Sequence, residues 1–97
     1  QHLKCYMENV YDKILDNHPN IQLMIVSKND KFLKTNLNQQ KAMEMNACIL
    51  NFTDKVRVLM KKLLPDEQVD NIRIKGIKDE IFVTFDELLE IIVIEKH

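Results

Sequence analysis

The chain has 97 residues, a hydrophobic fraction of 45% and a formal net charge of −1. This length is typical of a single domain, here residues 1–97. A nearly neutral chain lacks the basic excess that binds phosphate, so we expect no nucleic-acid partner. No apolar run approaches the roughly 20 residues of a transmembrane helix, and we expect no membrane partner.

The N-terminal part of the sequence predicts a helix followed by two strands. Apolar side chains recur at helical spacing at Leu3, Met7, Val10 and Ile14. They indicate an amphipathic helix over residues 2–16, which Pro19 ends because proline disfavours a helical residue before it. Alternation then predicts a strand over residues 21–27, and a polar turn leads to a shorter strand over residues 32–37.

Residues 39–64 form the longest predicted element, a helix with Asn38 as its N-cap and Pro65 as its stop. An apolar arc that we expect to cover the sheet contains Met45, Cys48, Ile49, Phe52, Val56, Leu59, Met60 and Leu63. A second stripe on the opposite side contains Met43, Ala47, Leu50, Asp54, Arg57 and Val58. A monomer should be uniformly polar there, so this stripe predicts pairing with another helix. On these faces, Leu50→Asp should split a pair, whereas Phe52→Asp should unfold the chain.

The C-terminal third predicts three strands joined by polar turns at residues 76–79 and 86–87. In the first strand, residues 69–75, two isoleucines alternate with Asn71, Arg73 and Lys75, so one face is buried and the other is wet. The last strand, residues 88–94, is apolar on both faces apart from Glu90. Such a strand must be covered on both sides, which predicts a sheet with helices above and below it.

The order of these elements and several segments resemble the roadblock family of dynein light chains. Residues 73–86, Arg-Ile-Lys-Gly-Ile-Lys-Asp-Glu-Ile-Phe-Val-Thr-Phe-Asp, are similar to the family segment Arg-Ile-Arg-Ser-Lys-Lys-x-Glu-Ile-Met-Val-Ala-Pro-Asp. Residues 89–94, Leu-Glu-Ile-Ile-Val-Ile, are similar to its closing strand, and residues 23–27 to its first strand. The resemblance covers about residues 3–96. Departures include Asp30 in place of a hairpin glycine, and Phe32 and Phe85 in place of prolines.

This resemblance implies an α+β fold of profilin-like type. Its five-stranded antiparallel sheet is flanked by an N-terminal helix and a long central helix, and two chains pair into a ten-stranded sheet. The implied interface comprises Met43, Ala47, Leu50, Asp54, Arg57, Val58, Asn71, Arg73 and Lys75. The partner is another roadblock-type light chain, identical or not, and the pair binds a dynein intermediate chain in a motor complex of the cytoplasm and cytoskeleton, with the cilium or axoneme as one location. Related members instead bind or regulate small Ras-like GTPases, which is the alternative function.

Site chemistry is sparse, and we expect neither an enzyme nor a metal or cofactor site. Gly76 is the only glycine, so no glycine-rich phosphate loop exists. Cys5 and Cys48 lack the spacing of a metal site and read as reduced packing residues on helices. We also expect a single chain to offer no concave site, so that the partner binds only the assembled pair.

Overall fold

The computed structural model describes residues 2–18, 20–28, 31–86 and 89–96. The elements in chain order are α1 (His2–Asn17), β1 (Ile21–Lys28), β2 (Lys31–Thr35), α2 (Gln39–Leu63), β3 (Asn71–Lys75), β4 (Asp79–Phe85) and β5 (Glu90–Lys96). The predicted order of helices and strands is confirmed. The predicted turn residues Asp30 and Glu87, and Leu88 at the predicted start of the last strand, lie outside the described residues.

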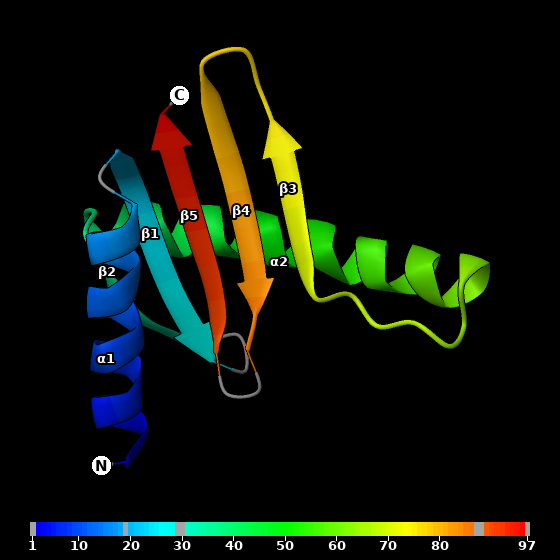
Figure 1. The fold of residues 1–97 in the computed structure, drawn as a ribbon, viewed down its shortest axis with the longest axis horizontal. Coiled ribbons are helices and arrows are strands. Elements are labelled where there is room, and N and C mark those ends of the chain that lie inside the picture. Colours follow the sequence, from blue (N-terminus) through cyan, green and yellow to red (C-terminus); the bar gives the residue numbers. More distant parts are fainter. Residues whose placement is uncertain (1, 19, 29–30, 87–88, 97) are drawn as a thin grey trace.

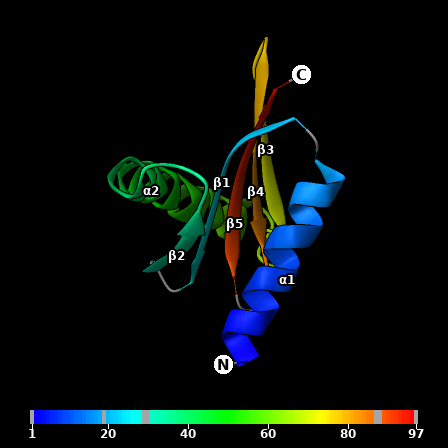
Figure 2. The same ribbon diagram turned by 90° about the vertical axis from the view of Figure 1, so that its left-hand side faces the viewer.

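The five strands form one antiparallel sheet in the order β2-β1-β5-β4-β3 (Figure 1). The two helices cover opposite faces of this sheet, as Figure 2 shows in side view. The last strand in the chain, β5, therefore lies in the middle of the sheet. Its position explains why it is apolar on both faces, and the predicted α+β class is confirmed.

The core consists of one apolar layer on each face of the sheet. On the α1 side, Tyr11 of the helix packs with Val26, Leu89, Ile91 and Val93. On the α2 side, the buried residues are Ala42, Val83 and Ile92, with half-buried residues such as Met45 and Ile49 around them. Successive residues of β5 thus point into opposite layers, as the two-residue period of a strand requires.

Three strand ends differ from the predicted ones because turns begin earlier or end later. β2 ends at Thr35, whose hydroxyl Oγ1 accepts the Leu37 amide at 3.1 Å and forms a local turn. β5 begins only at Glu90, and ahead of it the Asp86 amide donates to the Leu89 carbonyl at 2.8 Å. β3 begins at Asn71 rather than Val69, since residues 64–70 form the connection from α2.

The buried face of α2 differs from the predicted arc. Its fully buried residues are Ala42, Asn46 and Thr53, all small or of medium size. Phe52, Leu59 and Leu63 were expected in the core but are 43%, 55% and 67% exposed. Small residues let the helix approach the sheet closely, so the contact is centred on them and the larger apolar side chains lie on the flank. The expectation that Phe52→Asp unfolds the chain therefore loses its basis.

Cys5 and Cys48 are both exposed and unbridged, so the expectation that they serve as packing residues is wrong. Within the described ranges, neither helix combines the length and the apolar character needed to cross a membrane.

Candidate functional site

The edge of the sheet at β3 is the first part of the candidate site. β3 is the last strand in the sheet order and pairs only with β4 among the described strands. Four of its five residues are exposed. An edge of this kind presents unpaired backbone donors and acceptors, and it can accept a further strand.

The charge at the middle of this edge is neutralised within the chain. Arg73 donates from Nε and Nη2 to the carboxylate of Glu80 on β4, and the second contact measures 3.3 Å. The Glu80 side chain is 7% exposed, and the Arg73 guanidinium also lies 4.6 Å from the centroid of the Phe82 ring. A second β3 strand could therefore place its own arginine opposite Arg73 without meeting an uncompensated positive charge.

Helix α2 extends beyond this edge. Its 25 residues span about 37 Å, whereas five strands at about 4.8 Å spacing span about 19 Å. Figure 1 shows the C-terminal part of α2 continuing past β3. This part carries Val58, Leu59 and Leu63, and Leu64 follows it directly; each of the four is more than half exposed. A long helix end with four exposed apolar side chains lacks a sheet beneath it and is suited to lie over another one.

The contact between Arg57 and Phe85 shows which flank of α2 faces which end of the sheet. The Arg57 guanidinium lies 4.1 Å from the centroid of the Phe85 ring, and Phe85 ends β4. The Phe85 amide donates to the Asp70 carbonyl at 3.1 Å, which places Phe85 level with the residue before β3. The Arg57 flank therefore faces the start of β3, and the opposite flank faces the β3–β4 hairpin.

The opposite flank of α2 carries Phe52, Leu59 and Leu63. At 100° per residue, these side chains lie on the other side of the buried centre from Arg57. On the sheet, Ile74 is 39% exposed and points to the same layer, because it pairs with Ile81 of the α2-side core. Helix flank and strand edge thus both expose apolar side chains toward the hairpin end, and we call these four residues the hairpin-side surface: Phe52, Leu59, Leu63 and Ile74.

The position of α2 matches the spacing required for two-fold pairing through β3. An antiparallel pair of β3 strands would have its axis near the middle residue, Arg73. At about 3.3 Å per residue, Arg73 lies about 10 Å along the chain from Asp70. The Arg57 flank of α2 lies level with Phe85 and Asp70. Because a helix is about 10 Å wide, its axis lies about 5 Å further toward the hairpin, which is about 5 Å short of the level of Arg73. Two such helices would lie about 10 Å apart, which is within the range of packed helices, with the hairpin-side surface between them.

The predicted interface residues fall into two groups in the structure. Asn71, Arg73 and Lys75 are exposed along the β3 edge. The residues predicted on the helix, Met43, Ala47, Leu50, Asp54, Arg57 and Val58, lie to the Arg57 side of α2 or on its outer face. Leu50 is half-buried and Arg57 is in contact with Phe85, whereas Met43 and Val58 are 54% and 57% exposed. The part of these predicted residues in pairing stays a prediction. The hairpin-side surface is a further candidate interface, and the helical pattern had assigned its helix residues to the core.

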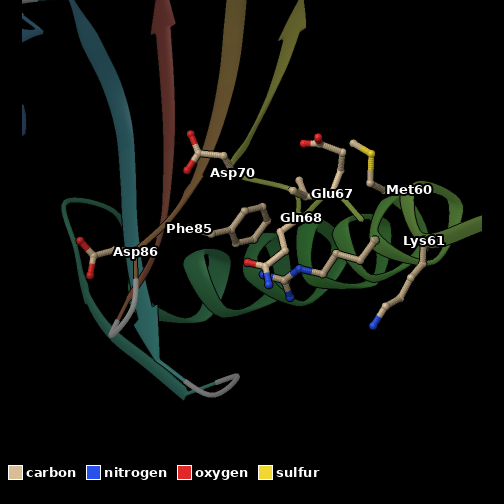
Figure 3. Close-up of a pocket in the computed structure, with 9 residues that line it drawn as sticks. Met60, Lys61, Glu67, Gln68, Asp70, Phe85 and Asp86 are labelled. Carbon is tan, nitrogen blue, oxygen red and sulfur yellow. The ribbon is translucent and has the colours of Figure 1, made fainter. Parts of the chain in front are cut away.

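A cavity lies on the Arg57 side of α2, so the expectation that one chain offers no concave site is wrong. Its volume is about 500 Å³, and it is lined by Arg57, Met60, Lys61, Glu67, Gln68, Val69, Asp70, Phe85 and Asp86. Figure 3 shows that the lining comes from three places: α2, the connection before β3, and the end of β4. The lining combines the apolar side chains of Met60, Val69 and Phe85 with three carboxylates and with the basic side chains of Arg57 and Lys61. The described part of the chain holds no group of three or more metal-ligating side chains.

Comparison with known proteins supports the fold. No protein-family model matches the sequence, and no curated protein matches it. Among solved structures, the chain is similar to a Roadblock/LC7 domain from Streptomyces avermitilis, with a TM-score of 0.75 and 11% identity over 88% of this chain and 73% of that one. It is also similar to MglB of Myxococcus xanthus, with a TM-score of 0.70 and 15% identity over 86% of this chain and 70% of that one. The chain thus has the roadblock/LC7 fold, and the resemblance seen in the sequence is confirmed at the level of the fold.

Proposed function

We propose that this protein is a non-catalytic scaffold that works as a two-fold pair of roadblock-type chains. The observation that carries the proposal is the end of α2, which extends past the β3 edge with Leu59, Leu63 and Leu64 exposed. Pairing through β3 would place this helix end over the partner's sheet and join the two sheets into ten strands. The second chain is a copy of this one or another roadblock-type light chain.

The cargo of the pair is a segment of a dynein intermediate chain. This part of the proposal is supported by the resemblance of residues 73–86 and 89–94 to the roadblock family of dynein light chains. A disordered segment loses conformational entropy on binding, so a broad and preformed surface such as a ten-stranded sheet suits it. In this role the protein belongs to the cytoplasm and cytoskeleton, and to the cilium or axoneme when the motor is axonemal.

A small Ras-like GTPase is the alternative partner of the pair. This alternative is supported by the same family resemblance, because related roadblock members bind or regulate such GTPases. The two functions share the paired scaffold and differ in the partner surface.

The experiment has two stages. Light scattering at micromolar concentration should return twice the chain mass of 11.5 kDa if the pair is formed by two copies. A monomer mass would contradict that pair, and a monomer mass that persists when a second roadblock-type light chain is added would contradict the paired scaffold. Calorimetry should then show binding of an intermediate-chain fragment to the pair and not to a monomeric variant. Binding of a small GTPase, without binding of the fragment, would favour the alternative function as a GTPase-binding scaffold. Equal binding by monomer and pair would remove the requirement for pairing.

A further inference from the structure

The tip of the β3–β4 hairpin carries an isoleucine in full contact with solvent. Ile77 is 98% exposed, in a turn closed by the Gly76 amide donating to the Asp79 carbonyl at 2.8 Å. Tight turns usually carry polar residues and glycine, so this apolar tip is out of place in an isolated chain. Lys75 and Lys78 lie on either side of it in the sequence.

The proposed pairing determines what faces this tip, and the inference rests on that pairing. In an antiparallel two-fold pair, facing residue numbers add up to twice the number of the central residue. Centres at Ile72, Arg73 or Ile74 give sums of 144, 146 or 148, so position 77 faces position 67, 69 or 71 of the second copy. Each of these positions lies in or beside the segment 67–70, which forms one wall of the cavity.

The cavity offers apolar contacts to the isoleucine of the tip and a carboxylate-bearing wall to the adjacent lysine. Met60, Val69 and Phe85 are half-buried around the cavity and offer an apolar floor to an isoleucine side chain. Three carboxylates and two basic side chains line the same cavity, and the carboxylates of Glu67 and Asp70 lie on the wall that would face Lys78 of the tip. The cavity of one chain can therefore accept the tip of the β3–β4 hairpin of a second copy, with Ile77 as the inserted side chain.

We propose that the cavity is a receptor site for Ile77 of a second copy of this chain. The two-fold pair is then closed by two reciprocal tip insertions, one at each end of the joined β3 strands. Lys78 stabilises the insertion through the carboxylates of Glu67 and Asp70, whereas Lys75 points to the other face of the sheet.

Cysteine crosslinking tests this geometry. The background carries Cys5→Ser and Cys48→Ser, because both native thiols are exposed. Ile77→Cys and Val69→Cys are added together. Within one chain β3 alone separates these positions by about 13 Å, beyond the ~7 Å that a disulfide spans between Cα atoms, so any disulfide must join two chains. Mild oxidation should give a covalent dimer, whereas Ile77→Cys alone, or paired with Asn17→Cys at the end of α1, should not.

The results separate the inference from the proposed function. A dimer mass by light scattering, with no disulfide from position 77 to position 67, 69 or 71 when each is tested in its own double variant, would overturn the tip insertion and leave the pairing intact. A monomer mass would overturn both. The dissociation constant of the dimer is an independent measurement, and Ile77→Ser should raise this Kd about tenfold. The conservative variant Ile77→Leu and the exposed control Leu15→Ser should leave the Kd within about twofold. An unchanged Kd for Ile77→Ser would also overturn the insertion.

Discussion

Arg57 on α2 and Phe85 at the end of β4 are in cation–π contact, with 4.1 Å between the guanidinium carbon and the ring centroid. The contact joins the helix to the end of the strand that borders β3, and Phe85 stands where the roadblock family carries proline. Proline has no aromatic ring and no amide hydrogen, so neither this contact nor the Phe85 amide bond to Asp70 could form with it.

We expect Arg57→Ala to lower the free energy of unfolding by about 1 kcal/mol through loss of this contact and of the packed side-chain stem. Phe85→Leu should cost a similar amount, and the double variant should show a coupling of about 0.5–1 kcal/mol. Urea unfolding measures each value, with Lys55→Ala, an exposed position on the same helix, as the near-neutral control. Additive losses would mean that the two side chains do not interact.

Phe52→Asp should separate the proposed pair while the fold persists. The side chain is 43% exposed in one chain, so the charge is hydrated in the monomer but would be desolvated between two packed helices, at several kcal/mol. Light scattering should give a monomer mass with unchanged circular dichroism. Asn51→Asp, on the exposed outer face of α2, should stay paired. If Leu50→Asp separated the pair and Phe52→Asp did not, the Arg57 side of α2 would be the interface.

Arg73→Ala should destabilise the chain because it leaves the carboxylate of Glu80, 7% exposed, without its partner. We expect a loss of about 1–3 kcal/mol, the cost of an unsatisfied buried polar group, at the lower end because Arg73 itself is largely in solvent. Chemical denaturation should show that adding Glu80→Ala to Arg73→Ala recovers part of this loss. A double variant less stable than Arg73→Ala would contradict the pairing of these two charges.

Tyr11 should titrate above its ordinary value. Burial, followed by the nearby negative charge of Asp12, raises the pKa of its hydroxyl above 10.0. Below pH 10.0 the phenol is protonated in both the folded and the unfolded chain. As the pH rises toward the raised pKa, the unfolded chain loses this proton first, so the free energy of unfolding falls.

Ultraviolet absorbance of a Tyr6→Phe variant follows Tyr11 alone, because the chain has two tyrosines. Its midpoint should lie above 10.0, and a midpoint at or below this value would count against the burial of the ring. In denaturation series above pH 10, Tyr11→Phe should lose less stability per pH unit than the wild type. Tyr11→Phe keeps the ring beside the Lys34 amine, 4.4 Å from its centroid, so packing is conserved in this comparison.

The sequence by itself determined the order of the elements and the boundaries that depend on local chemistry. Asn38 caps α2, its Oδ1 accepting the Lys41 amide at 3.2 Å, and the helix ends before Pro65. The apolar run Ile91–Val93 implied a strand covered on both faces, and β5 is the central strand. These features follow from hydrogen bonds and burial periods that neighbouring residues establish among themselves.

The tertiary structure alone decided which side of α2 meets the sheet. The helix carries apolar residues around most of its circumference, so helical periodicity allows several orientations. The sheet selects the one in which Ala42, Asn46 and Thr53 permit close approach, and Phe52 and Leu59 stay outside. The cavity has the same origin, since Arg57, Val69 and Phe85 come together only when the connection before β3 folds back against the end of β4. Contacts between residues distant in sequence depend on packing, which local patterns do not encode.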